Sequence, residues 1–142
     1  MSRHVRNATL GFVLVCALGT GCGGDDTSAA AASKGNAAAG GTAVNTRACA
    51  TCHTGTKGLL AGRDMAITGP NITPDKTTGI GEWTEAQIVK AILTGVDDEG
   101  EPLCATMYRY GTMGMTETEA HDIAAYLKSI PAVSNVSKPA CP

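Results

Sequence analysis

One pentapeptide constrains this chain more than any other stretch of the sequence. Residues 49–53 are Cys-Ala-Thr-Cys-His, a C-x-x-C-H motif. Two thiols one helical turn apart can each add across a vinyl group of a porphyrin, and the adjacent imidazole can then bind the iron from one face. The motif therefore predicts that Cys49 and Cys52 attach a c-type haem covalently and that His53 is an axial ligand of its iron.

The C-x-x-C spacing also occurs in redox-active dithiols and in zinc sites, and these are the alternatives for residues 49–53. A thioredoxin-like dithiol is expected within a βαβ pattern, and a zinc site usually needs a second pair of closely spaced ligands downstream. The sequence contains neither pattern. We therefore favour a single haem c as the cofactor of this chain.

The composition suits a chain that folds around such a group. The 142 residues leave room for one domain plus processing segments, and they include only one Trp, one Phe and three Tyr. A core made of side chains alone would be thin, and a buried porphyrin would supply the missing apolar surface. The formal net charge of −2 argues against nucleic acid as a partner, because nucleic-acid binding needs a basic face.

Residues 1–21 have the features of an export signal. A positively charged start precedes an apolar run over residues 8–18, which is too short to be a permanent membrane anchor. The segment leads to Cys22 and resembles a bacterial lipoprotein signal, although Gly19 stands where Leu is usual. We expect Cys22 to carry a lipid on the periplasmic side of a membrane. Cleavage to a soluble periplasmic protein is the alternative.

Residues 22–36 are rich in Gly, Asp, Ser, Thr and Ala, a composition that predicts a flexible tether. The haem domain is expected to occupy residues 37–142. An Ala-rich stretch over residues 38–48 predicts a short helix that ends at the haem motif. Gly40 and Gly41 weaken this helix by propensity, or they mark a close contact between helices.

Two stronger helix signals follow a glycine-rich stretch at residues 54–68, which we expect to be a loop. Thr84 opens a capping-box pattern before an apolar face that Gly95 ends, and Thr116 caps a last helix that ends before Pro131. No segment alternates as a long strand does. The sequence therefore predicts an all-α domain.

Residues 69–75, Gly-Pro-Asn-Ile-Thr-Pro-Asp, are expected to form a stiff extended segment. Their two prolines fix φ and lack amide donors. A ligating His normally donates its other ring N–H to a carbonyl or carboxylate. We expect the Pro70 carbonyl to accept this bond from His53, and a surface turn without contact to the site is the alternative.

The second axial ligand decides between electron transfer and reactivity at the iron. Met107 and Met113 both lie in an irregular stretch that can bend over the haem, and spacing alone prefers neither. Met115 directly precedes a helix cap, where we expect it to pack as a hydrophobic staple. His121 lies between charged residues of the last helix, and we expect it to face solvent. The candidates are Met65, Met107, Met113, Met115, His121 and the thiol of Cys104.

Several motifs occur in the order found in a known family. They are Cys49–His53, Gly69–Asp75, Thr78–Thr84, Gly95, Pro102-Leu103, Met107 and Ala125–Pro131. Over roughly residues 40–133 the chain resembles a class I cytochrome c. Within that class it is most similar to the domains that accept electrons from periplasmic dehydrogenases. The resemblance implies a small cytochrome c fold, in which three main helices and their loops wrap around one haem.

The resemblance also implies roles for individual residues. It makes the 49–53 motif the source of the two thioether bonds and the proximal ligand, and it makes Met107 the distal ligand. It places Trp83 at the haem edge near the propionates. The sequence departs from the family at Tyr108, where those domains usually have Pro after the axial Met. Met113 or an open site is therefore the alternative.

Cys104 and Cys141 have no role in this assignment. In an oxidising compartment they would most economically form a disulfide that ties the ligand loop to the chain end. Such a link would stabilise the fold by about 3 to 4 kcal/mol by restricting the unfolded chain. Thiolate ligation of the iron by Cys104 is the alternative.

These features predict a single-haem electron carrier outside the cytoplasm. Its partners would be redox proteins, such as a dehydrogenase or components of a respiratory chain, met through a small and transient interface. One alternative is a haem enzyme whose open axial site reduces peroxide or a nitrogen oxide. Another is a sensor in which a gas displaces Met107. The visible spectrum of the protein would separate the three.

Overall fold

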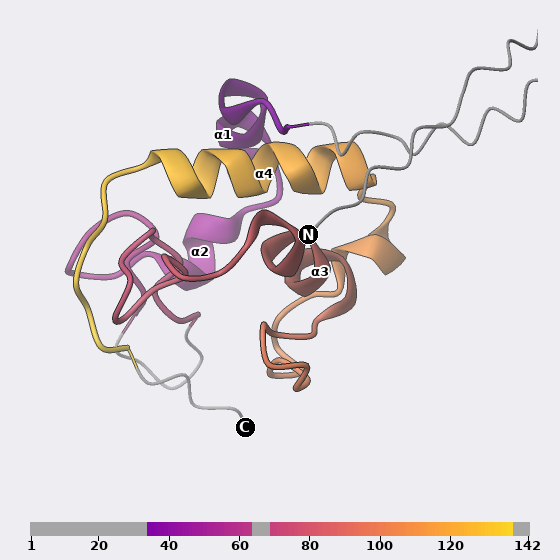
Figure 1. Ribbon diagram of the computed structural model, residues 1–142. Coiled ribbons are helices and arrows are strands. Elements are labelled where there is room, and N and C mark those ends of the chain that lie inside the picture. The colour runs from indigo at the N-terminus through magenta and orange to yellow at the C-terminus, as the bar shows by residue number, and fades with distance from the viewer. Residues whose placement is uncertain (1–33, 64–68, 138–142) are drawn as a thin grey trace, which may run out of the picture.

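The chain folds as helices joined by irregular loops (Figure 1). The computed structural model describes residues 34–63 and 69–137. Its elements are α1 (Ala37–Thr46), α2 (Cys49–His53), α3 (Glu85–Thr94), the 3-10 helix η1 (Tyr110–Met113) and α4 (Glu117–Ser129). Within these ranges β pairing is limited to two isolated bridges. The all-α prediction is confirmed.

The predicted ends of α3 and α4 are also confirmed, whereas α1 ends at Thr46, before the end expected at residue 48. Thr84 and Gln87 form a complete capping box at the start of α3, and Gly95 ends that helix in the left-handed conformation. At the start of α4, the Thr116 hydroxyl accepts a hydrogen bond from the Glu119 backbone amide. These caps satisfy helix-end groups that lack partners within the helix, which explains why the boundaries follow the sequence.

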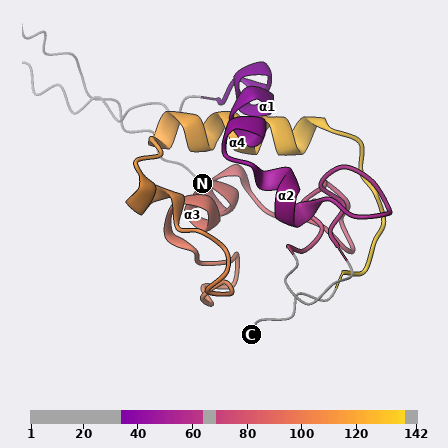
Figure 2. The same ribbon diagram turned by 180° about the vertical axis from the view of Figure 1, so that it is seen from behind.

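Helix α1 lies across α4 at the back of the molecule (Figure 2). A Cβ placed on Gly40 would lie 1.9 Å from the Asp122 carbonyl oxygen, so only glycine allows the two backbones to come this close. The Asn36 amide, just before α1, donates to the Asp122 carboxylate at 2.6 Å. The expected role of the small residues in close helix contact is therefore the one observed.

Arg47, at the end of α1, forms a two-pronged ion pair with Glu119 of α4. Its Nε and Nη2 atoms donate to the two carboxylate oxygens at 2.8 and 2.7 Å. The Glu119 side chain therefore binds Arg47 and does not close a capping box at Thr116. Arg47 holds the pKa of the Glu119 carboxyl below its usual value. This pair fixes the chain just before the C-x-x-C-H motif.

The apolar sides of α1, α3 and α4 form the core, together with residues of the loops. Leu60, in the loop after α2, is fully buried and has a left-handed backbone with φ of 59°. Met115 is buried in the same cluster, as expected for a residue that precedes the α4 cap. The large buried side chains are Val44, Leu60, Ile80, Ile88, Val89, Ile92, Tyr110, Met115, Ile123 and Leu127.

The prediction for His121 is wrong. Its side chain is only 12% exposed, and its Nδ1 lies 2.6 Å from a carboxylate oxygen of Glu85. The first turn of α3 packs beside α4, so the polar side of α4 faces another helix at this point. His121 therefore links α3 to α4 and does not line the central cavity.

Several predictions concern residues outside the described ranges. These are the export signal at residues 1–21, Cys22, the tether up to residue 33, Met65 and Cys141. The described end of the predicted tether already contacts the domain, because Gly35 packs against the α4 backbone. None of the helices in the described ranges is long and apolar enough to cross a bilayer.

Candidate functional site

A cavity of about 470 Å³ lies at the centre of the fold, within the usual size range of ligand sites. Its wall includes Cys49, Cys52 and His53 from α2, and Met107 from the chain before η1. The remaining wall is mainly apolar. Its large hydrophobic side chains include Val44, Ile72, Ile80, Trp83, Ile88, Ile92, Leu103, Met115, Ile123 and Leu127.

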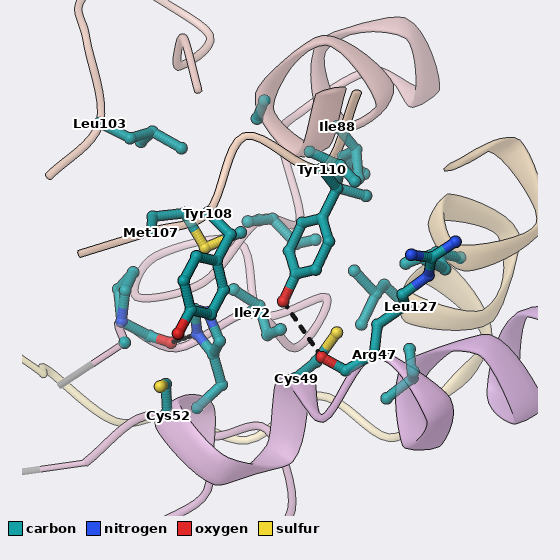
Figure 3. Close-up of a pocket in the computed structure, with 18 of the residues that line it drawn as sticks. Arg47, Cys49, Cys52, Ile72, Ile88, Leu103, Met107, Tyr108, Tyr110 and Leu127 are labelled. Carbon is teal, nitrogen blue, oxygen red and sulfur yellow. Dashed lines mark hydrogen bonds between the residues drawn. The ribbon is translucent and has the colours of Figure 1, made fainter. Parts of the chain in front are cut away.

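Helix α2 brings both thiols to this cavity. The chain leaves α1 through Ala48, whose left-handed backbone (φ 56°) turns it into the short α2 helix. Cys49 and Cys52 are three residues apart, so they lie on one face of the helix. Figure 3 shows both sulfur atoms directed from α2 toward the side of the cavity occupied by Met107 and Tyr110. Burial raises the pKa of the Cys49 thiol.

His53 ends α2 and is 5% exposed. Its Nδ1 lies 2.7 Å from the Pro70 carbonyl oxygen, which is the hydrogen bond expected from the sequence. A carbonyl can only accept, so Nδ1 carries the proton and Nε2 keeps its lone pair for a metal. Burial lowers the pKa of His53, although the Pro70 carbonyl acts in the opposite direction. Burial and the single accepting partner thus favour the neutral ring that metal binding requires.

Gly69 allows the proximal segment (residues 69–75) to pass directly over this ring. A Cβ at Gly69 would lie 2.4 Å from His53 Nδ1. The Gly69 amide also donates to the Cys52 carbonyl at 2.9 Å. The absence of a side chain is thus required at this position, and the segment is attached to the end of α2 through the Gly69 amide and the Pro70 carbonyl.

Asn71 holds the next part of the proximal segment. It is 2% exposed, and its side-chain nitrogen Nδ2 donates to the Val133 carbonyl at 2.7 Å and to the Thr78 hydroxyl at 3.1 Å. Its side-chain oxygen accepts from the amide and the hydroxyl of Thr73, and its backbone amide donates to the Ser137 hydroxyl. Sequence reasoning missed this network, since its partners lie up to 66 residues away.

The distal segment (residues 103–110) forms the opposite wall. Its first amide, from Leu103, donates to the Gly95 carbonyl at 2.8 Å. Met107 is partly buried against the core and lines the cavity. Met113 is 54% exposed and does not line it. Of the two methionines that spacing alone left equal, only Met107 is placed at the cavity.

Tyr110 is a cavity residue that sequence reasoning missed. It is 6% exposed, its hydroxyl donates to the Arg47 carbonyl at 3.1 Å, and its ring meets that of Tyr108 edge to face at 5.9 Å (Figure 3). Burial raises the pKa of Tyr110 to about 12, so the hydroxyl remains a donor at neutral pH. The scarcity of aromatic residues was the one signal that could have pointed to it.

Trp83, which precedes α3 in the sequence, and Cys104, which follows it, also line the cavity. Among the described residues the free thiols are those of Cys49 and Cys52. Cys141, the predicted partner of Cys104, lies outside the described ranges, so their pairing stays a prediction.

A covalently attached porphyrin fits this arrangement of side chains. The cavity offers two thiols on one helical face and an otherwise mainly apolar wall. It also offers the His53 imidazole, whose Nδ1 is hydrogen-bonded to the Pro70 carbonyl. Within residues 34–63 and 69–137, no three His, Cys, Asp or Glu side chains converge as at a site for a bare metal ion. The donor set and the lining are those of a haem c pocket.

Comparison with known proteins gives a match over the same part of the chain. Residues 36–127 match a family model described as cytochrome c oxidase, cbb3-type, subunit III. The matched range includes the C-x-x-C-H motif, the proximal segment and the distal segment, and it ends within α4.

Three curated proteins illustrate the wider similarity. The fructose dehydrogenase cytochrome subunit of Gluconobacter japonicus is 34% identical over 87 residues, which cover 56% of this chain and 18% of that protein. The cytochrome c subunit of the quinone alcohol dehydrogenase of Gluconacetobacter polyoxogenes is 32% identical over 85 residues, covering 55% and 18%. The gluconate 2-dehydrogenase cytochrome c subunit of Pantoea cypripedii is 39% identical over 66 residues, covering 42% and 15%. The similarity thus spans less than a fifth of each relative.

Proposed function

The chain belongs to the c-type cytochrome family described as cytochrome c oxidase, cbb3-type, subunit III, and on this premise we propose that it carries one electron at a time between redox partners outside the cytoplasm. The observation that carries the proposal is the cavity on which Cys49, Cys52, His53 and Met107 converge. When bound, haem c supplies an iron centre that accepts and releases a single electron.

The residues of α2 would hold this group on its proximal side. Cys49 and Cys52 would form the two thioether bonds, and His53 would bind the iron through Nε2. The Pro70 carbonyl supports this role, because its bond to Nδ1 fixes the tautomer and the orientation of the ring. A ring held in this way keeps the same position in both oxidation states, which favours fast electron transfer.

Met107 would be the distal ligand. Its place on the cavity wall supports this choice over the exposed Met113. A thioether ligand favours the reduced iron, and the apolar lining disfavours the additional charge of the oxidised state. Both effects raise the reduction potential. Trp83 also lines the cavity and would border the edge of the porphyrin near its propionates.

The names of the relatives support a proposal for the redox partner. Their names describe cytochrome subunits of dehydrogenases, which supports a dehydrogenase or another respiratory component as the redox partner of this chain. We further propose export by residues 1–21, a lipid at Cys22 and a Cys104–Cys141 disulfide. The disulfide is supported by the free thiols of the described residues, which are those of Cys49 and Cys52 alone. The mass of the intact, unreduced protein tests the lipid and the disulfide together.

The function is tested by comparing Met107→Ala with the matched variant Met113→Ala. The wild-type holoprotein should take up and release one electron reversibly, and its ferric form should show the weak long-wavelength absorption band of a thioether-bound haem. Met107→Ala should abolish the band, and Met113→Ala should keep it. A wild-type protein with a high-spin ferric spectrum would indicate a haem enzyme. Ready CO binding by the wild-type ferrous form would indicate a gas sensor.

A further inference from the structure

The Tyr110 hydroxyl joins two parts of the cavity wall that are far apart in the sequence. Tyr110 is the last residue of the distal segment. Its hydroxyl donates a hydrogen bond at 3.1 Å to the carbonyl of Arg47, which lies 63 residues earlier in the sequence. Figure 3 shows this bond running from the Tyr110 ring to the chain beside Cys49. The bond therefore connects the segment that carries Met107 to the residue before the haem-attachment helix.

The acceptor of this bond is well fixed. Arg47 is the C-cap of α1, and the chain then turns through the left-handed Ala48, so the Arg47 carbonyl does not continue the α1 hydrogen-bond pattern. The guanidinium of Arg47 is bound by both oxygens of Glu119. Tyr110 thus binds a carbonyl whose position is set by α1, α2 and α4 together.

The distal segment is otherwise held near its start, where Cys104 is disulfide-bonded, and by backbone bonds at its two ends. At its start the Leu103 amide donates a hydrogen bond to the Gly95 carbonyl. At its end the Tyr110 carbonyl accepts a hydrogen bond from the Met115 amide. Between these points Tyr108 is 59% exposed, and the Met107 amide bonds only within the segment, to the Cys104 carbonyl. The Tyr110 hydroxyl is therefore the side-chain bond that holds the Met107 end of the segment to α1.

We propose that Tyr110 is a positioning residue for the distal ligand, and that its hydroxyl keeps the distal segment closed over the cavity so that Met107 stays in place and outside ligands are excluded. This inference rests on the proposed role of Met107. Removing the hydroxyl leaves the ring to fill its space, but it deprives the Arg47 carbonyl of its bond and favours an open segment.

The test is an imidazole titration of the ferric holoprotein, followed by its absorption spectrum, for wild type, Tyr110→Phe and Tyr126→Phe. Tyr126 lies on α4 outside the cavity, and its hydroxyl has no hydrogen-bond partner among the described residues. Losing one hydrogen bond should lower the dissociation constant for imidazole roughly three- to tenfold in Tyr110→Phe. Tyr126→Phe should stay within about twofold of wild type.

A merely structural role would not give this result. Urea unfolding of the same proteins measures global stability, whereas imidazole binding requires only that the distal segment opens locally. Equal imidazole affinities of wild type and Tyr110→Phe would overturn the proposal, as would an equal change in Tyr126→Phe. The wild-type spectrum separates this failure from that of the proposed function. A wild type without the thioether band would refute Met107 ligation, and with it the role of Tyr110.

Discussion

The two walls of the cavity are built differently. On the proximal side, Pro70 bonds to His53, and Asn71 is buried among hydrogen bonds from several segments. On the distal side, half of residues 103–110 are exposed, and the segment is held by backbone bonds at its two ends, by the disulfide-bonded Cys104 and by the Tyr110 hydroxyl. The proposed proximal ligand, His53, therefore lies beside a buried hydrogen-bond network, and the proposed distal ligand, Met107, lies on a partly exposed segment.

The difference between the two walls bears on electron transfer at the proposed haem. A rigid proximal side keeps the imidazole in one orientation, which limits the rearrangement that accompanies each electron transfer. In the proposed function, the partly exposed distal segment would hold Met107 while leaving that side close to solvent, where a redox partner could approach. We expect changes on the proximal side to affect assembly and stability, and changes on the distal side to affect access to the iron.

The largest effect is expected from replacing the ligands one at a time. His53→Ala should reduce the yield of holoprotein by more than about tenfold, because even residues that only hydrogen-bond to a metal ligand commonly contribute 10- to 100-fold to metal affinity. Met107→Ala should be recovered at nearly the wild-type yield, with an altered spectrum. Haem staining after denaturing electrophoresis gives the yields. Equal losses in the two variants would contradict the asymmetry of the two walls.

The next largest effect should come from the proximal network. Asn71→Ala removes several buried hydrogen bonds, and we expect it to lower the free energy of unfolding by about 2 to 4 kcal/mol. Tyr108→Ala, on the exposed distal side, should cost less than about 1.5 kcal/mol. Urea denaturation of the two holoproteins provides the comparison. A loss for Asn71→Ala no larger than that for Tyr108→Ala would show that the network does not stabilise the fold.

The smallest effect is expected from the ion pair between Arg47, whose carbonyl accepts the Tyr110 hydrogen bond, and Glu119. Arg47 lowers the pKa of Glu119 in the folded state, so the stabilisation is fully present above the unfolded pKa of about 4.3 and is lost as pH falls through the lower folded pKa. Glu119→Gln should therefore have a lower Tm than wild type at neutral pH, and the difference should vanish in strong acid. Thermal melts across this pH range test the sign. A difference that grows on acidification would contradict it.

The sequence predicted the features that depend on local chemistry. Thr84 and Thr116 cap helices because their hydroxyls reach amides three residues away, and Gly95 adopts a backbone that side chains disfavour. The bond between His53 and Pro70 was predictable because a ligating imidazole needs an acceptor, and the proline-rich segment offers a carbonyl in a stiff frame.

Features that depend on distant partners were not predictable in this way. His121 was expected in solvent because its neighbours in the sequence are charged, but the packing of α3 beside α4 brings Glu85 to it. Tyr110 gains its role only when the fold places it beside Arg47. The choice between Met107 and Met113 likewise required the path of the chain before and through η1.

The central claim is that this chain holds one haem through Cys49 and Cys52. Mass spectrometry of proteolytic peptides from the purified protein, expressed with functional haem-maturation machinery, tests it most directly. We predict that the peptide containing both cysteines carries the added mass of one haem and has no alkylatable thiol. Recovery of that peptide without added mass, with both thiols open to alkylation, would contradict the account.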